Sequence, residues 1–245
     1  MKQNLFYILI ICLLHSCNSD NYKTELLGNW YFYDKPESAK HLNEFRIYSD
    51  SIVINSIMGK TTAMWKATNS QIILYNLKGY PRDSKLTYEY KLKSNDLLHL
   101  KIYRDTIIEF KDIVKARNAM EFLQKSISLK IDLPNENREL LEIGNSRYNF
   151  TIYAGYHANK LEFKTDYSST LGNLEEDISK FKNDLKGIPF EAARFVIVAD
   201  KNIPKTKMDS LINKLDQSSI KRIFRVFTNK NYEYESNLYW MGRIE

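Results

Sequence analysis

Cys17 is the residue whose surroundings point most clearly to a chemical reaction. It follows a polar start with one positive charge, Met1 to Asn4, and a ten-residue apolar run, Leu5 to Leu14. A basic start, a short apolar core and a small residue before the cut are typical of a secretory signal. The apolar core is too short to span a bilayer as a helix, which needs about 20 residues. We therefore expect cleavage before Cys17, which leaves its thiol as the first side chain of the mature protein.

Leu14-His15-Ser16-Cys17 resembles the lipobox of bacterial lipoproteins, in which a leucine stands three residues before an obligatory cysteine, although His15 is an unusual middle residue. The resemblance implies that residues 1–16 are a signal peptide, that Cys17 carries lipid (palmitate), and that residues 17–27 form a tether. It implies a lipid-anchored protein of the cell envelope, and we expect the outer membrane of a Gram-negative bacterium. The leaflet and the face stay open. An ordinary cleaved signal or an uncleaved anchor is the alternative.

The remaining residues predict no catalytic site, no metal site and no cofactor. Cys12 leaves with the signal, so the mature chain has no cysteine for a disulfide, a zinc site or a thiol nucleophile. His41, His99 and His157 lie far apart, and none has the spacing of a metal ligand. Glu175-Glu176-Asp177 stands in the first turn of a predicted helix, where carboxylates meet the positive end of the helix dipole. We therefore expect a protein that is not an enzyme.

The positive charge is modest and spread along the chain. The formal net charge is +6, and it becomes +5 when Lys2 leaves with the signal (6 − 1 = 5). The basic residues mostly alternate with apolar ones, as on the solvated face of a strand. A nucleic-acid-binding protein would cluster them with interleaved aromatic residues. The pattern therefore excludes nucleic acid as a partner and favours a solvated surface, with a bias toward anionic lipid or cell-wall polymer.

Residues 28–111 have a hydrophobic period of two, broken by short polar turns. In the cleanest strand, Lys85 to Lys93, apolar and aromatic residues alternate with polar ones. About eight such strands joined by hairpins predict an antiparallel meander that closes into a small barrel or folds as a sandwich. We expect its interior to be filled by large side chains, namely those of Phe45, Trp65, Tyr88 and Tyr90.

Gly28-Asn29-Trp30 stands at the head of the first of these strands. Together with the meander, this Gly-x-Trp motif resembles the lipocalin-like domains of bacterial lipoproteins. The resemblance implies that Trp30 packs across the base of the barrel, so that Gly28 and Trp30 have a structural role. The segment is shorter than a full lipocalin. A barrel of about eight strands either is filled by its own side chains or holds one small ligand.

The period becomes helical from Asp112, where Ile113, Ala116, Met120 and Leu123 predict a linker helix over 112–125. Beyond it, the sequence predicts a two-layer α/β domain over 126–228. We expect strands over 149–154, 160–164, 195–199 and 222–228. An amphipathic helix over 171–185, with Asn173 as its N-cap, and a second helix opened by Pro204 complete a strand–helix–strand crossover.

Ile131-Asp132-Leu133-Pro134 and the run from Phe195 to Lys201 carry a second resemblance. They are similar to the periplasmic domain of ExbD/TolR biopolymer transport proteins, although Ser219 stands where that family usually has glycine. The resemblance covers residues 126–228 and implies contacts with partner proteins and, for some members, with the cell wall. The family's proton-driven role depends on a transmembrane helix with a buried aspartate, which this chain lacks, so that role is not implied.

These observations predict an α+β protein with a lipocalin-like β-domain, an ExbD/TolR-like α/β domain and an aromatic tail over 229–245. We expect a non-enzymatic interaction or scaffold module that is linked to biopolymer transport and contacts an envelope protein, itself or the cell wall. Asp200, Tyr239 and Trp240 are its candidate contact residues, although Asp200 also fits a simple strand-end turn and the tail fits one more docked strand. The alternative is a carrier of a small hydrophobic ligand in the barrel.

Overall fold

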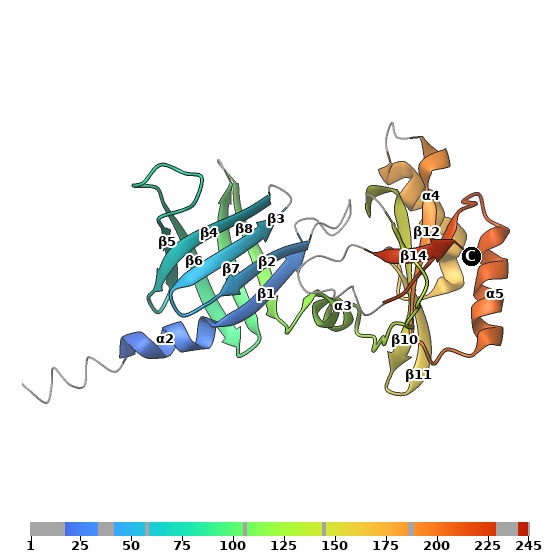
Figure 1. The fold of residues 1–245 in the computed structure, drawn as a ribbon, viewed down its shortest axis with the longest axis horizontal. Coiled ribbons are helices and arrows are strands. Elements are labelled where there is room, and N and C mark those ends of the chain that lie inside the picture. Colours follow the sequence, from blue (N-terminus) through green and yellow to red (C-terminus); the bar gives the residue numbers. More distant parts are fainter. Residues whose placement is uncertain are drawn as a thin grey trace, which may run out of the picture. The chain divides into compact units, whose positions relative to one another are not determined.

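The computed structural model describes residues 18–33, 42–56, 59–104, 107–143, 146–185, 189–228 and 240–244. These residues form two compact units, and the second unit begins at Ala119 (Figure 1). The signal segment, Cys17 and Tyr239 lie outside the described residues. In the part of the chain that is described, no helix combines the length and the apolar character that a membrane span requires.

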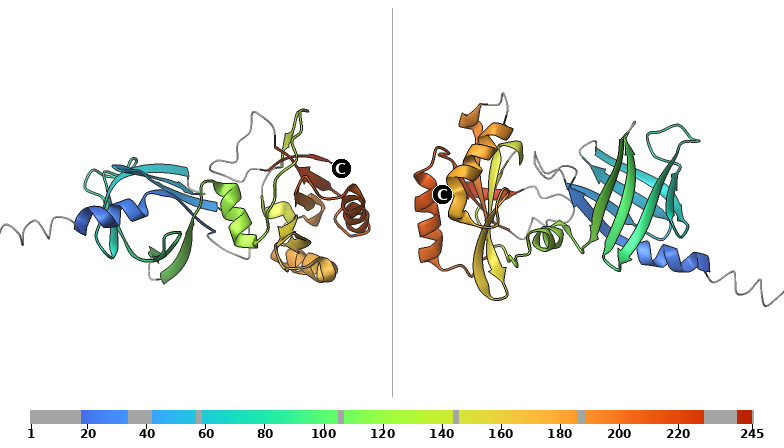
Figure 2. Two further views of the ribbon diagram at one scale, coloured as in Figure 1. Left: turned by 90° about the horizontal axis from the view of Figure 1, so that it is seen from below. Right: turned by 180° about the vertical axis from the view of Figure 1, so that it is seen from behind.

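The first unit is a closed barrel of eight antiparallel strands in sequential order (Figures 1 and 2). Its strands are β1 (Gly28–Tyr33), β2 (Leu42–Ile47), β3 (Ser51–Ser56), β4 (Gly59–Ala67), β5 (Gln71–Tyr75), β6 (Lys85–Ser94), β7 (Leu97–Arg104) and β8 (Ile107–Lys115). The barrel closes where Trp30 of β1 pairs with Lys115 of β8. The predicted antiparallel meander is therefore confirmed, and it closes rather than folding as a sandwich. Closure leaves the sheet without an exposed edge.

One end of the barrel is sealed by the Gly-x-Trp motif and by the helix before it, α2 (Asn18–Leu26). Trp30 is completely buried, and Leu26 at the end of α2 belongs to the same core. Gly28 has a φ of +120°, and a Cβ atom there would lie 2.8 Å from Cε of Lys115. Only glycine fits such a backbone beside a neighbouring side chain without strain. We refer to this end of the barrel, where β1 begins, as the base.

The helix that follows the barrel strands in the chain begins later than its sequence pattern predicts. Residues 112–115 belong to strand β8, and helix α3 (Ala119–Ile127) starts at Ala119 rather than at Asp112. Ile113 is fully buried in the barrel core, and Val114 pairs with Tyr31 to close the barrel. The prediction of a helix over 112–115 is therefore wrong, because pairing with β1 takes these residues into the sheet.

The second unit is built on a six-stranded mixed sheet in the order β11-β10-β12-β13-β14-β9. The strands are β9 (Leu141–Glu142), β10 (Asn149–His157), β11 (Lys160–Thr165), β12 (Arg194–Ala199), β13 (Ile223–Val226) and β14 (Met241–Ile244). Strands β10, β12 and β13 are parallel, and the other pairs are antiparallel. The parallel pairs confirm the predicted strand–helix–strand crossover.

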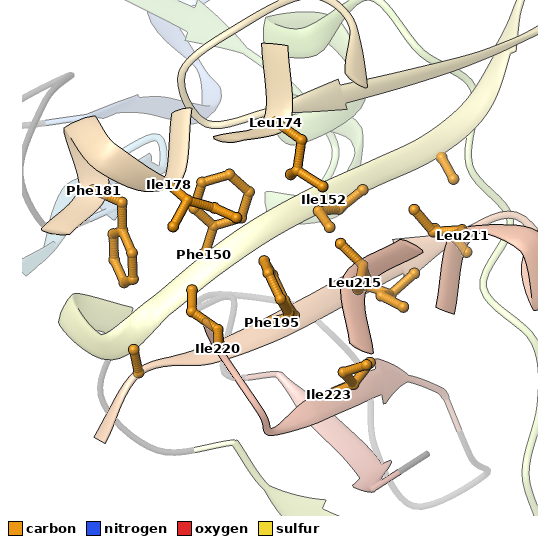
Figure 3. Packing of buried hydrophobic residues seen from close by; sticks show 14 of the residues in the cluster. Phe150, Ile152, Leu174, Ile178, Phe181, Phe195, Leu211, Leu215, Ile220 and Ile223 are labelled. Atoms are coloured by element: carbon orange, nitrogen blue, oxygen red, sulfur yellow. The ribbon is translucent and has the colours of Figure 1, made fainter. Parts of the chain in front are cut away.

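Helices α4 (Leu174–Asp184) and α5 (Lys205–Asp216) pack on one face of this sheet. Figure 3 shows the side chains of both helices meeting Phe150 of β10 and Phe195 of β12. The opposite face is also covered, because Leu123 of α3 packs with Val196 of β12. Figure 2 shows α3 across the sheet from α4 and α5. The unit therefore has a third layer beyond the two that the sequence predicts.

The structure shows only some of the capping interactions that the sequence predicts at the starts of the helices. Asn173 is the N-cap residue of α4, as predicted, but its side chain makes no capping hydrogen bond. The side chain of Thr170 accepts a hydrogen bond from the Gly172 N–H and so caps the short 3₁₀ turn that leads into α4. Pro204 occupies the N-cap position of α5. Proline fits this place because its missing N–H would have no partner inside the helix.

Candidate functional site

The register of the barrel strands shows which side chains face the interior. Tyr90, Leu100 and Lys111 are partners across β6, β7 and β8, so they share one face of the sheet. Leu100 is completely buried in the barrel core. Because side chains alternate along a strand, Glu109, Lys111 and Ile113 of β8 all face inward. Their exposed neighbours Ile108 and Phe110 face outward.

The interior is tightly filled at the base. Its largest side chains are those of Trp30 and Trp65, which are 0% and 2% exposed. The indole N–H of Trp65 donates to the carbonyl oxygen of Tyr48 at 2.8 Å, so its polar atom is satisfied. Phe45, Trp65, Tyr88 and Tyr90, which the sequence places inside, all belong to this core or pack against it. No apolar ligand could enter the base without displacing Trp30 or Trp65.

The interior is in contact with solvent toward the opposite end, where β4 and β6 begin. Leu86 faces inward, because it is the strand partner of the buried Leu74, yet it is 39% exposed. Ile54, Thr61 and Tyr88 also face inward and are only partly buried. Inward side chains that keep contact with water mark the solvent-accessible half of the interior.

A charged pair lies inside this accessible half. Lys111 Nζ is 3.4 Å from Glu109 Oε2, and the two side chains are 20% and 34% exposed. The Oε2 atom itself is buried and has no hydrogen-bond partner. A carboxylate oxygen that is withdrawn from water without a donor is unfavourable. Beyond its ion pair with Lys111, the Oε2 atom can therefore still accept a hydrogen bond.

Aromatic side chains line the same interior. The rings of Phe32 and Phe45 meet edge to face at 5.7 Å, and Phe45 and Tyr88 are 6.2 Å apart. Burial raises the pKa of the Tyr88 phenol, so the group stays neutral in the physiological range. Asn43 is buried among them and is a neutral polar residue of this lining. The set offers apolar surface, one charged pair and two neutral polar groups.

The sequence did not identify Glu109 and Lys111 as interior residues. Basic residues that alternate with apolar ones indicate a solvated strand face, and this general pattern does not distinguish Lys111 from the outward-facing lysines. The available signal was the phase of the alternation, since Ile113 lies two residues beyond Lys111 on the same face. The sequence alone did not assign this phase, because Ile113 also fits the helical spacing of the segment that follows.

The candidate contact residues of the second unit are buried. Asp200 is 2% exposed, and its carboxylate accepts hydrogen bonds from the backbone N–H groups of Asp132 (2.7 Å) and Asn202 (2.8 Å). Trp240 is 8% exposed and leads into β14, which pairs with β13 and β9. Both residues therefore stabilise the second unit. The described part of the aromatic tail forms a docked strand, as the docking prediction expected.

The acidic residues of α4 lie in its first turn, as predicted. Asp177 among them is completely buried, and its Oδ2 atom accepts hydrogen bonds from the hydroxyls of Thr165 (2.7 Å) and Ser168 (2.5 Å). This carboxylate connects the helix to the end of β11. Asp177 therefore has a structural role that its place in the helix dipole did not reveal.

A second buried carboxylate lies on the outer face of β2. Glu44 is completely buried and accepts hydrogen bonds from the Tyr31 hydroxyl (2.7 Å) and the Asn55 amide (2.6 Å). The Arg46 guanidinium lies 2.9 Å from its Oε1 atom. Burial, together with the carboxylate of Glu44, raises the pKa of the Tyr31 phenol. Both oxygens have donors, so Glu44 links three strands, and its complete burial keeps it from contact with a ligand in solution.

The described histidines do not form a catalytic or metal centre with other such groups. His99 lies on the outer face of β7, where Nδ1 is 2.7 Å from Asp112 Oδ1 and its ring stacks on Phe110. His157 Nδ1 lies 3.1 Å from the carbonyl oxygen of Ser128. Across the described ranges, no three His, Cys, Asp or Glu side chains come close enough together to hold a metal ion.

Comparison of the chain with protein-family models, with curated proteins and with solved structures finds no match.

Proposed function

We propose that this protein is a non-enzymatic binding protein of the cell envelope, whose barrel takes up one small amphipathic ligand. The observation that carries the proposal is the contrast between the two halves of the barrel interior. Inward side chains are sealed from water at the base, whereas Leu86 (39% exposed) and Glu109 (34%) keep contact with solvent. A site of this kind buries the apolar part of a ligand and leaves a polar group near water.

The Gly-x-Trp motif supports the likeness to lipocalin-like domains that the sequence indicates. Trp30 is buried beside α2, and the ammonium group of Lys115 lies 5.2 Å from its ring centre. Such a sealed base favours binding from the opposite end. The lipid anchor at Cys17 and the envelope location are part of the same proposal and rest on the lipobox alone.

A pair of tryptophan substitutions tests barrel binding. Thr61 faces the interior, because it pairs with Ile54, whereas the next residue, Thr62, faces outward. We expect Thr61→Trp to abolish binding of the uncharged fluorescent probe N-phenyl-1-naphthylamine, because its side chain fills the accessible half of the interior. Thr62→Trp should bind the probe as the wild type does. Equal binding by both variants, with unchanged thermal stability, would exclude the barrel interior as the site.

An adaptor role of the second unit is a second candidate, favoured by one feature of its sheet. Strand β11 is a terminal strand of six residues that pairs only with β10 among the described strands. A peptide strand from a partner could extend the sheet at this edge. This candidate function includes the likeness to ExbD/TolR domains. Its partner is an envelope protein or a second copy of the chain, and it extends to contact with the cell wall.

Site-specific photocrosslinking in cells tests the adaptor role. A photoreactive amino acid at Lys160, which is exposed on β11, should capture one defined envelope protein. The same amino acid at Lys207, which is exposed on α5, is the matched control and should capture none. The same products from both positions would contradict a role for the β11 edge.

A further inference from the structure

We infer that Glu109 makes the barrel select ligands that carry a cationic, hydrogen-bond-donating head, such as a primary amine, on an apolar body. This inference rests on the proposed binding function of the barrel and names the ligand class. The carboxylate lies inside the accessible half of the interior. Its buried Oε2 atom lies 3.4 Å from the Lys111 ammonium and accepts no hydrogen bond from the described part of the chain. A ligand ammonium group would supply a positively charged hydrogen-bond donor.

The placement of Tyr88 supports a cationic head. Tyr90, Leu100 and Lys111 form one row across three strands. Tyr88 and Glu109 each lie two residues from that row, toward the solvent-accessible end, so both face the accessible half of the interior. Aromatic ring faces attract cations, and a carboxylate in the same half of the interior adds to that attraction. The ring of Tyr88 and the carboxylate of Glu109 thus both favour a cationic head group.

Lys111 does not reverse this preference. Its ammonium lies 3.4 Å from Glu109, so its charge is already partly neutralised by the carboxylate that it faces. A ligand carboxylate that approached Lys111 would also approach Glu109 and be repelled by it. A ligand ammonium would be repelled by Lys111, but it could donate to Glu109 Oε2, a buried oxygen that accepts no hydrogen bond from the residues that the structure describes. The Glu109 oxygen that accepts no hydrogen bond therefore determines the preference for a cationic head group.

The apolar body would lie against inward side chains deeper in the barrel. Ile54 and Leu86 face the interior and are partly exposed, and Phe32 and Phe45 continue the apolar surface toward the base. A short linear chain that ends in an aromatic group fits this surface better than a large rigid body, because the base is closed by Trp30 and Trp65.

Two fluorescent probes that differ only in the head group test the inference. N-dansylcadaverine ends in a primary amine, and N-dansyl-6-aminohexanoic acid has the same chain length and ends in a carboxylate. We expect the full-length chain to bind the amine about tenfold more tightly than the acid, as for one charge-assisted hydrogen bond. Glu109→Gln should reduce the preference to less than about twofold, because the neutral amide loses the charge.

The control is Glu89→Gln, since Glu89 lies on the outer face of β6 with Lys101 as its partner at 3.1 Å. This control should keep the wild-type preference. If Glu109→Gln lowers the melting temperature, Glu109→Asp serves as a second variant that keeps the charge and should keep a preference for the amine. Equal binding of both probes, or tighter binding of the acid, would overturn the inference and leave barrel binding intact. Failure of both probes to bind would overturn the barrel proposal as well.

Discussion

The indole N–H of Trp30 donates a 2.7 Å hydrogen bond to the backbone carbonyl oxygen of Leu26. Both residues are completely buried, so this bond joins the last turn of α2 to the first strand of the barrel. A carbonyl near a helix end has no partner within the helix and needs one from elsewhere. Trp30 supplies that donor while its ring fills the base of the barrel.

Replacement of Trp30 should therefore destabilise the barrel. We expect Trp30→Phe to lower the free energy of unfolding by about 2–4 kcal/mol, because it leaves a cavity and removes the donor to Leu26. Urea unfolding followed by far-UV circular dichroism measures the change. The matched control is Tyr48→Phe, an aromatic residue that is 47% exposed, and it should change the value by less than about 0.5 kcal/mol. A similar loss in both variants would contradict a special role for Trp30.

The buried carboxylate of Glu44 should be equally sensitive to substitution. Glu44→Ala would leave the Tyr31 hydroxyl and the Asn55 amide without their acceptor and Arg46 without its charge partner. We expect a loss of about 2–4 kcal/mol in unfolding free energy. Chemical denaturation of the single and double variants measures it. Tyr31→Phe in the Glu44→Ala background should cost much less than in the wild type, and full additivity would contradict the interaction.

Substitution of Asp200 distinguishes a structural role of this residue from a role in partner contact. Asp200→Ala removes the acceptor of two backbone N–H groups in a site that is almost fully buried. We expect a loss of about 2–3 kcal/mol in unfolding free energy. The exposed Asp209 on α5 is the control, and its alanine variant should unfold like the wild type. Unchanged stability of Asp200→Ala, together with loss of a crosslinked partner, would instead assign Asp200 to an interaction surface.

The His99–Asp112 pair on the outer barrel face predicts a small pH dependence of stability. Hydrogen bonding to His99, with a further contribution from Lys93, lowers the pKa of Asp112. A carboxylate whose folded-state pKa is depressed contributes stability above its unfolded-state pKa and loses it as the pH falls through the folded-state pKa. Since the Asp112 side chain is 54% exposed, the contribution should stay below about 1 kcal/mol.

Asp112→Asn tests this dependence. The variant should be slightly less stable than the wild type at pH 7, and the difference should vanish under acid conditions where Asp112 is protonated in both states. Unfolding free energies at pH 7 and at several lower pH values measure it. A difference that grows as the pH falls would have the wrong sign and would contradict the pairing. Thr87→Ser, at an exposed position on β6, is a neutral control.

Much of the fold followed from local patterns in the sequence. Alternation from Lys85 to Lys93 placed Tyr88 and Tyr90 inside, and their cross-strand partners show that they are inside. Pro204 marked the start of α5, and the apolar run from Phe195 to Ala199 became a strand that is buried on both faces. These features depend on period and backbone restriction, which act over a few residues.

The sequence by itself thus determined the hairpin order of the barrel, the crossover of the second unit and the large side chains of both cores. Tertiary structure decided the features that depend on distant pairing. Ile113 fits a strand and a helix equally well, and only its place beside β1 at barrel closure made it a strand residue. The pairing of β8 with β7 in the closed barrel likewise places the Glu109 and Lys111 side chains in the interior. Burial of Asp200 likewise depended on Asp132, 68 residues earlier in the chain. Such contacts join residues far apart in sequence, and local periodicity contains no information about them.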